Sequence, residues 1–366
     1  MTTLAPVEAR HQLHTLRVAA IERLTDDAVA LTFAVPEDLQ PLFRFAPGQH
    51  VALVRRDHRD ETRRNYSVSS PAGGPLQVAV KRLPEGVFSG FVHGELRPGG
   101  ELDVLPPTGR FTVTPDPTRS RHCAAVAAGS GITPVLSIVA SVLEFEPTSR
   151  CTLIYGNRTT SSIMFVEELA DLKDRYPDRF QIIHILSREP QALPLAEGRI
   201  DGPKLELLLA TLVPPDDVDE WFICGPLSMV ETARATLRGR GVEAAAIHTE
   251  LFHAEDPPVV TQVDVQDSAA LENRATVTLV LHGRSTQLMV PREGRSILDS
   301  ALAVRPDAPY ACKGGVCATC RCRLVEGKVR MDHAYALEED EIAAGLVLAC
   351  QSHPLSDTVK VDFDGV

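Results

Sequence analysis

Apolar and polar positions follow three different patterns along the 366 residues of the chain. In residues 1–118, short segments alternate apolar with polar residues or are rich in β-branched residues, and Gly- and Pro-containing turns separate them. The clearest of these segments are 16–24, 28–36, 48–56, 64–71, 76–82 and 101–107. Short strands at this spacing are typical of an antiparallel barrel or sandwich, so this fold is predicted, with a linker near 115–120.

Residues 119–252 change to continuous apolar runs that alternate with amphipathic segments. The runs read as buried parallel strands at 122–128, 151–155, 180–186 and 220–224. The segments between and after them predict helices at 133–145, 162–176, 203–212 and 226–240. This alternation predicts an α/β domain with a doubly wound parallel sheet that has helices on both faces. Ligands of such sheets bind beyond the carboxyl ends of the strands.

Residues 253–272 are acidic, contain proline and lack clear periodicity, so a tether between domains is expected here. About twenty flexible residues span roughly 25 Å on average, which would let the next domain swing. Residues 273–366 begin with a predicted hairpin at 275–290 and a short helix at 295–304. We therefore expect domains at 1–118, 119–252 and 273–366.

The charge balance and the apolar stretches narrow the possible partners. Lys plus Arg is 37 and Asp plus Glu is 49, which gives a net charge of −12 and argues against nucleic acid as the main partner. The N-terminus has no apolar segment of signal-peptide length. The apolar stretch 123–143 is interrupted by GSG and TP, and this favours a strand, turn and helix over a membrane span. A cytoplasmic protein without membrane partners is expected, and its cysteines more often bind metal than form disulfides.

Four cysteines have the spacing of a plant-type 2Fe-2S site. Cys312, Cys317 and Cys320 are separated by four and two residues, and Cys350 follows later. The small residues between the first two let the backbone approach inorganic sulfide and direct N–H groups at it. The alternative is tetrahedral zinc, which usually takes two C-x2-C pairs, whereas only one is present unless Cys322 takes part. Cys322 is expected to point to the opposite face of a strand and to pack there.

Three further segments suggest nucleotide and flavin binding, each with a simpler alternative. Gly129 and Gly131 follow a strand and open a helix, as in pyrophosphate loops, although a plain turn is the alternative. Cys224 ends another strand where the reactive ring of a nucleotide is expected, or it is a buried structural cysteine. Arg64 and Tyr66 share one face of a strand, which suits a flavin and its diphosphate, or an exposed basic strand.

In their order along the chain, several motifs resemble the ferredoxin-NADP reductase superfamily. They are FAPGQ (45–49), RNYS (64–67), GSGITP (129–134), YGNRTTSSIMFVEEL (155–169) and CGP (224–226). This resemblance covers about residues 10–252, and residues 273–366 resemble plant-type ferredoxins. Together they imply an FAD-binding β-barrel, an NAD(P)-binding α/β domain and a β-grasp ferredoxin domain, in the order found in reductase components of multicomponent oxygenases.

The resemblance also implies roles for individual residues. Those expected to bind FAD are Arg64, Tyr66, Ser67, Val80, Lys81, Gly86, Val87, Phe88 and Ser89. Those expected to bind the nicotinamide nucleotide are Gly129, Ser130, Gly131, Thr133, Cys224, Gly225 and Pro226. Glu250 and Phe252 match an acid-x-aromatic end that approaches the flavin, and Ser67 and Cys224 are the catalytic candidates. The family usually has a second glycine where this chain has Pro84-Glu85.

The sequence Ser187-Arg188-Glu189 follows the third strand of the expected parallel sheet. Related enzymes place a Ser-Arg pair against the 2′-phosphate of NADPH, and a guanidinium suits phosphate. An acid at the strand end instead favours the ribose 2′-OH of NADH. NADPH is therefore expected, while Glu189 leaves NADH open.

The implied reaction takes two electrons from NADPH as a hydride to FAD and passes them singly through a 2Fe-2S centre to an oxygenase component. The potential of such centres is about −400 mV. Two alternatives remain open. One is a reductase for a different oxygenase, such as a ketosteroid or aromatic-ring hydroxylase. The other is a redox-responsive regulatory protein that binds the same groups without sustained turnover.

Overall fold

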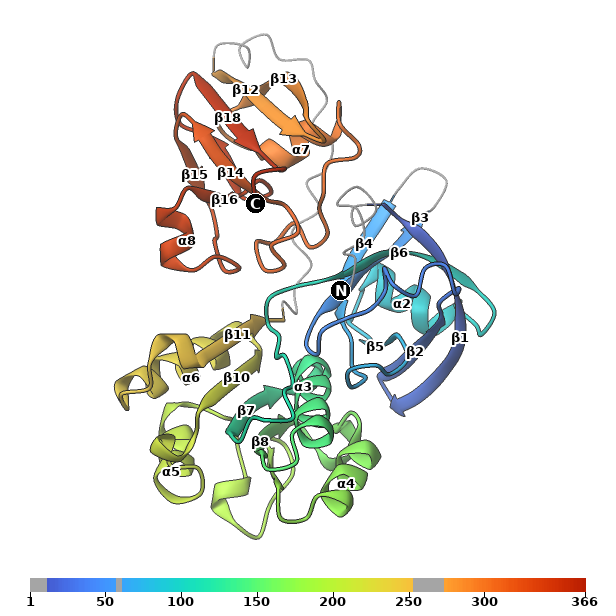
Figure 1. Cartoon of the computed structure of the whole chain (residues 1–366), viewed down its shortest axis with the longest axis vertical. Coiled ribbons are helices and arrows are strands. Elements are labelled where there is room, and N and C mark those ends of the chain that lie inside the picture. The colour runs from blue at the N-terminus through green and yellow to red at the C-terminus, as the bar shows by residue number, and fades with distance from the viewer. Residues whose placement is uncertain (1–11, 57–60, 253–272) are drawn as a thin grey trace. The chain divides into compact units, whose positions relative to one another are not determined.

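The computed structural model describes residues 12–56, 61–252 and 273–366 (Figure 1). The expected tether at 253–272 lies outside these residues. The chain divides into two compact units, one of which holds the first two sheets except residues 63–65, and the other the C-terminal sheets together with residues 63–65. All sheets fall within the three expected domain segments, and the domain boundaries themselves stay a prediction.

The first sheet has six strands in the order β4-β3-β6-β1-β2-β5. The strands are β1 (His14–Thr25), β2 (Ala28–Ala34), β3 (His50–Arg56), β4 (Glu61–Ser67), β5 (Gln77–Lys81) and β6 (Glu101–Thr108). The pairs β1–β2, β1–β6, β3–β6 and β2–β5 are antiparallel. An isolated bridge between Val68 and Val78 brings the two outer strands together, so the sheet closes toward the predicted barrel.

One helix in this sheet domain, α2 (Val87–Gly94), was not predicted from the apolar pattern. Its sequence VFSGFVHG contains two glycines, which are poor helix formers. Phe88 and Val92 lie four residues apart on the same helix face and are buried in the barrel core. Tertiary packing therefore holds this helix against its intrinsic preference.

The second sheet is parallel, as predicted, with the order β11-β10-β7-β8-β9. Its strands are β7 (His122–Ala128), β8 (Arg150–Asn157), β9 (Phe180–Leu186), β10 (Glu220–Gly225) and β11 (Ile247–Leu251). The connecting helices are α3 (Ile132–Phe145), α4 (Val166–Arg175), α5 (Gly202–Thr211) and α6 (Leu227–Gly239). Short 3-10 turns are η1 (Gly129–Gly131), η2 (Thr160–Ser162), η3 (Pro194–Ala196), η4 (Pro215–Asp217) and η5 (Ala244–Ala246).

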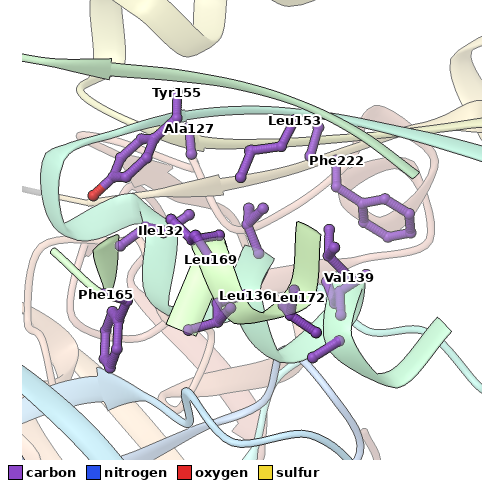
Figure 2. Close-up of a cluster of buried hydrophobic side chains, with 14 of the residues drawn as sticks. Ala127, Ile132, Leu136, Val139, Leu153, Tyr155, Phe165, Leu169, Leu172 and Phe222 are labelled. Carbon is purple, nitrogen blue, oxygen red and sulfur yellow. The ribbon is translucent and has the colours of Figure 1, made fainter. Parts of the chain in front are cut away.

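Helices cover both faces of the parallel sheet, which confirms the doubly wound arrangement. Figure 2 shows α3 and α4 packed on one face through Leu136, Val139 and Leu169, against Leu153 and Phe222 of the strands. Helices α5 and α6 pack on the opposite face, where the alternate strand residues point. Because both faces are buried, the strands read as continuous apolar runs.

Helix α4 begins four residues later than its apolar pattern suggested. Thr159 and Ser162 form a reciprocal capping box on the turn η2, and Phe165 then takes a left-handed conformation with φ of 58°. The buried Phe165 ring packs beside α3 and α4 (Figure 2). The local capping bonds therefore hold residues 160–162 in a separate turn rather than in the helix.

The C-terminal unit contains a five-stranded mixed sheet in the order β13-β12-β18-β14-β16. Its strands are β12 (Arg274–Leu281), β13 (Arg284–Pro291), β14 (Arg321–Glu326), β16 (Leu346–Leu348) and β18 (Thr358–Asp362), while β15 (Val329–Met331) pairs with β17 (Ser352–Pro354). The helices are α7 (Ile297–Leu302) and α8 (Glu339–Ala343). The hairpin β12–β13 and the short helix α7 match the predicted elements, and the mixed sheet agrees with the β-grasp expectation.

A buried ion pair lies between the start of β7 and the end of α3. Arg121 donates to both carboxylate oxygens of Glu146, at 2.6 and 3.0 Å, and to Glu220 at 2.8 Å. The Glu146 carboxylate also accepts the Ser149 hydroxyl at 2.7 Å and the Asp116 amide at 3.1 Å. The Glu146 side chain is fully buried, so these bonds replace its hydration.

Among the described residues, no helix has both the length and the apolar character needed to cross a membrane. The apolar stretch at 123–143 forms the strand β7, the turn η1 and most of α3, as its interruptions predicted.

Candidate functional site

Aromatic rings line the expected flavin strand. Tyr66 lies half-buried on β4, and its ring centroid is 5.7 Å from that of Phe88 on α2. Arg64 is on the same strand, two residues earlier and also half-buried. The planar surface and the guanidinium thus belong to one strand face, as alternation requires.

The segment before α2 forms a tight turn. The Ser89 hydroxyl accepts the Leu83 amide at 3.1 Å and donates to the Gly86 carbonyl at 3.3 Å. A Cβ at Gly86 would lie 2.5 Å from the Ser89 oxygen, so a larger residue would displace the Ser89 hydroxyl. Glu85 has φ of 60° in the place where the family usually has glycine, which costs about 1–2 kcal/mol for a residue with a Cβ.

Val80 and Lys81 end β5, and their expected contacts with FAD stay a prediction. Val80 is buried in the barrel core, and the Lys81 ammonium lies 3.4 Å from the Asp27 carboxylate. Val87, at the start of α2, is exposed. Lys81 and Val87 therefore lie at the barrel surface, where Lys81 already has a carboxylate neighbour, whereas Val80 faces the core.

Glu250, near the end of β11, connects the parallel sheet to the barrel. Its carboxylate accepts the Ser67 hydroxyl at 3.2 Å and lies 3.6 Å from Nδ1 of His50 on β3. Ser67 and His50 are buried. The strand register places Glu250 beside Cys224 of β10. Two catalytic candidates, Ser67 and Cys224, are thus brought to one carboxylate, which also belongs to the acid-x-aromatic motif.

The glycine loop after β7 packs tightly against the end of β10. A Cβ at Gly131 would lie 2.3 Å from the Cys224 carbonyl oxygen, and Gly129 has φ of 54°. The Tyr155 hydroxyl donates to the Gly129 carbonyl at 2.9 Å, and Thr133 donates to the Ser130 carbonyl at 3.1 Å. The loop is therefore held at the carboxyl edge of the sheet, where its backbone can approach a pyrophosphate.

Cys224 is fully buried between the loop and β11. Burial, and secondarily the nearby Glu250 carboxylate, raise the pKa of its thiol well above the usual value, so the thiol is neutral. Pro226 precedes α6 as its N-cap, and Phe252 donates its amide to the Gly225 carbonyl at 3.1 Å. A catalytic role of Cys224 stays a prediction, and the chemistry available to it is that of a neutral thiol.

Ser187 and Arg188 lie two strands away from the glycine loop, after the edge strand β9. Arg158, which was not predicted as a site residue, follows β8 and accepts the Arg188 amide on its carbonyl at 2.8 Å. Arg158 and Arg188 are both exposed, and within the described ranges neither guanidinium makes a hydrogen bond or ion pair. The Glu189 carboxylate accepts two hydrogen bonds from Thr160, one from its amide and one from its hydroxyl.

The four predicted cluster cysteines form two pairs. The thiols of Cys312 and Cys317 are within hydrogen-bonding reach of each other, and so are those of Cys320 and Cys350. Two irons bridged by two sulfides need two thiolates each, so this pairing fits a 2Fe-2S centre. In the part of the chain that the structure describes, no three His, Cys, Asp or Glu side chains are grouped as a single-ion site would require.

The backbone around these cysteines directs N–H groups at sulfur. Gly314 donates its amide to Cys312 at 3.3 Å, and the Gly315 amide points at Cys350. Lys313, Gly315 and Ala318 have φ of 53°, 75° and 54°, which curl the loop. Such donors stabilise thiolate charge and tune a cluster.

Cys322 lies outside this set, as expected. It sits on β14, is fully buried in the C-terminal core, and burial raises the pKa of its thiol far above the usual value. Gln351 was not predicted. Its amide donates to the Lys313 carbonyl at 2.8 Å and to the Cys350 sulfur at 3.6 Å, joining the two segments that supply the cysteines.

His50, Arg158 and Gln351 are thus the polar residues that sequence reasoning missed at these sites. Arg158 had a usable signal because it lies inside the motif at 155–169, and Gln351 had one because it directly follows Cys350. His50 had none, because its partner Glu250 lies two hundred residues further along the chain.

Three family models match consecutive parts of the chain. They are the oxidoreductase FAD-binding domain at residues 15–113, the oxidoreductase NAD-binding domain at 125–235, and the 2Fe-2S iron-sulfur cluster binding domain at 279–355. The chain belongs to the FAD- and NAD(P)H-dependent oxidoreductases of the ferredoxin-NADP reductase type that carry a 2Fe-2S domain.

Relatives of full length support this assignment. The chain is 46% identical to one of the subunits of 1,2-phenylacetyl-CoA epoxidase from Escherichia coli, over 96% of this chain and 98% of that protein. It is 36% identical to the 3-ketosteroid-9-alpha-monooxygenase ferredoxin reductase component of Rhodococcus rhodochrous, over 95% and 96%. The fold is also similar to that of phthalate dioxygenase reductase, with a TM-score of 0.59, 22% identity, and coverage of 98% and 100%.

Proposed function

We propose that this chain is the NADPH-oxidising reductase component of an oxygenase system, and that its acceptor is an oxygenase of the phenylacetyl-CoA epoxidase type. The observation that carries the electron-transfer role is the presence in one chain of a flavin strand, a nucleotide edge and two pairs of cysteines. The named acceptor is supported by the 46% identity to a protein of the epoxidase over nearly the whole chain.

When bound, FAD accepts a hydride from the nicotinamide, and a 2Fe-2S centre carries single electrons onward. The protein supplies position and electrostatics. The half-buried Tyr66 ring offers an aromatic surface, and the buried Phe88 ring packs against it with a tilt of 34°. The Ser67 hydroxyl donates to Glu250, so a proton can rest at the Ser67 oxygen beside a half-buried carboxylate. Gly131 lets the glycine loop lie flat against the Cys224 carbonyl.

The preference for NADPH rests on the two arginines at the carboxyl edge whose guanidinium groups are unpaired within the described residues. The pyrophosphate loop follows β7, and Arg158 and Arg188 follow the next two strands in order, β8 and β9. A nucleotide that extends from the loop along this edge would bring its 2′-phosphate to the two guanidinium groups. Arginine suits this role because its planar fork matches phosphate oxygens.

Replacing Arg188 by alanine is expected to raise the Michaelis constant for NADPH by about tenfold and to leave that for NADH within about twofold, because only NADPH carries the 2′-phosphate. Steady-state rates of NADPH and NADH oxidation with ferricyanide measure this. Arg238→Ala, which removes an exposed arginine in the last turn of α6, is the matched control and should change neither constant. Equal effects of Arg188→Ala on both nucleotides would contradict the assignment.

The acceptor is tested by reconstitution. We expect NADPH oxidation by the reductase with its FAD and 2Fe-2S centre bound to depend on phenylacetyl-CoA when the oxygenase part of the epoxidase is added. The amount of product formed should be proportional to the amount of NADPH consumed. The oxygenase component of a ketosteroid 9α-monooxygenase is the control, because its reductase is 36% identical to this chain. Faster turnover with the steroid oxygenase would replace the proposed acceptor, and a single stoichiometric reduction without turnover would favour a regulatory protein.

A cytoplasmic location is part of the proposal. All eight cysteines are free thiols in the structure, and a site built from four of them needs a reducing compartment to stay open to iron.

A further inference from the structure

The loops that follow β8 and β9 are joined beyond the ends of the strands. The strands stay in register up to Asn157 and Leu186. The pairing then continues, because Ser187 donates its amide to the Asn157 carbonyl at 2.9 Å and Arg188 donates to the Arg158 carbonyl at 2.8 Å. The backbones of the two arginines are therefore hydrogen-bonded to each other at the edge of the sheet.

A side-chain bridge closes the same two loops one step further on. Both oxygens of the Glu189 carboxylate accept from Thr160, one from its amide at 2.8 Å and one from its hydroxyl at 2.7 Å. These bonds, the amide first and the hydroxyl second, lower the pKa of Glu189, so the carboxylate is ionised at neutral pH. Thr160 is itself held in the capped turn η2.

The bridge changes what an acid at this strand end can do. A free carboxylate here would accept the 2′-OH of NADH and repel the 2′-phosphate of NADPH. Both carboxylate oxygens of Glu189 instead accept hydrogen bonds from Thr160, and these two donors stabilise its negative charge. Two sets of hydrogen bonds therefore hold the backbone around Arg188. Its own amide donates to the Arg158 carbonyl, and the side chain of its neighbour Glu189 accepts from Thr160.

We propose that Glu189 is a positioning residue that favours a 2′-phosphorylated nucleotide, by tying the β9 loop to Thr160 so that Arg158 and Arg188 are presented together. The inference deepens the proposed use of NADPH and rests on it. It reverses the usual expectation for an acid at this place, since removal of the negative charge should weaken phosphate binding instead of strengthening it.

Glu189→Ala tests this in the full-length holoprotein. Isothermal titration calorimetry with 2′,5′-ADP and with ADP measures the two dissociation constants. Because only 2′,5′-ADP carries the 2′-phosphate, their comparison separates binding of this group from binding of the rest of the nucleotide. The dissociation constant for 2′,5′-ADP should rise about fivefold, the scale of a lost charged hydrogen bond at an exposed site. The constant for ADP should stay unchanged. Tighter or unchanged binding of 2′,5′-ADP would overturn the inference.

Two variants at position 160 test the bridge without changing charge. Thr160→Val removes the hydroxyl donor and should weaken 2′,5′-ADP binding in the same direction, while Thr160→Ser keeps the hydroxyl and should bind as the wild type does. Glu189→Ala combined with Thr160→Val should cost no more than Glu189→Ala alone, because both remove the same bridge. Additive losses would show that the two residues act separately and would overturn the proposal.

Failure of the inference is distinguishable from failure of the proposed nucleotide. If the wild-type protein binds ADP as tightly as 2′,5′-ADP, the proposed use of NADPH is wrong. If it prefers 2′,5′-ADP and Glu189→Ala keeps that preference, only the role of Glu189 is wrong. In steady state, Glu189→Ala should raise the Michaelis constant for NADPH with kcat unchanged, as a change in nucleotide positioning alone requires.

Discussion

Cys350→Ala is expected to remove the 2Fe-2S centre and to lower electron delivery to the oxygenase by at least about a hundredfold. Replacing residues that only hydrogen-bond to metal ligands already costs about 10–100-fold in metal affinity or activity, and loss of a ligand should cost more. Cys350 shares one of the two thiol pairs with Cys320, and losing it leaves one iron with a single cysteine. Iron and sulfide analysis and the visible spectrum measure the loss. NADPH oxidation with ferricyanide should stay within about twofold, because the barrel and the parallel sheet form a separate compact unit.

Cys322→Ala is the matched control for this change. It removes another buried thiol from the same domain, only two residues after the predicted ligand Cys320, but its side chain packs into the core. The variant should keep two irons per chain and full transfer to the oxygenase. If Cys350→Ala retained two irons, the plant-type assignment would be wrong, and if Cys322→Ala lost them, Cys322 would have to be counted among the ligands.

Arg121→Ala is expected to destabilise the parallel-sheet domain by about 3–5 kcal/mol, because it leaves the Glu146 carboxylate buried without its cation. Urea denaturation followed by tryptophan fluorescence is a specific measurement, since the single tryptophan of the chain, Trp221, is fully buried on β10. Glu206→Gln is the control. It breaks the exposed pair with Arg240 between α5 and α6 and should cost less than about 1 kcal/mol. Similar losses in both variants would mean that burial does not set the cost.

The same pair gives a pH dependence with a definite sign. Burial alone would raise the pKa of Glu146, but the hydrogen bonds from Arg121, Ser149 and the Asp116 amide outweigh it and leave the pKa below its ordinary value. A depressed carboxyl pKa contributes stability above the unfolded-state value, and this contribution is lost as the pH falls through the folded-state value. The stability difference between the wild type and Glu146→Gln should therefore shrink below about pH 4.3, the ordinary glutamate pKa.

The sequence allowed prediction of features that depend on local patterns. Strands β7 to β10 were predicted because both faces are buried and their residues are continuously apolar. The spacing of Cys312, Cys317 and Cys320 predicted one loop with three cysteines, and the structure brings Cys350 to Cys320 from a separate segment. Their role as cluster ligands stays a prediction. Gly131 was predicted from its motif, although the neighbour that excludes a Cβ, the Cys224 carbonyl, could only be seen in the fold.

Features that depend on contacts between distant segments could not be predicted. Helix α2 contains two glycines and forms because Phe88 and Val92 are buried in the barrel. Strand β11 is five residues long and half-buried throughout, so its pattern lacks a clear period. The bridge from Thr160 to Glu189 joins residues 29 positions apart, and in the sequence Glu189 was an argument for NADH.

Glu250 has a consequence for how such reductases can be recombined. It belongs to the last strand of the parallel sheet, yet its carboxylate is held by Ser67 and His50 of the barrel. A chimaera that takes its barrel from another protein must supply a hydroxyl and an imidazole at these two positions. Otherwise the Glu250 carboxylate, which has little access to solvent, is left without these partners. These three residues all belong to the unit that holds the barrel and the parallel sheet, so replacing residues 273–366 by a different electron carrier leaves the Glu250 site intact. The natural place to cut and rejoin these chains is therefore after Phe252, and a junction between barrel and parallel sheet is the one to avoid.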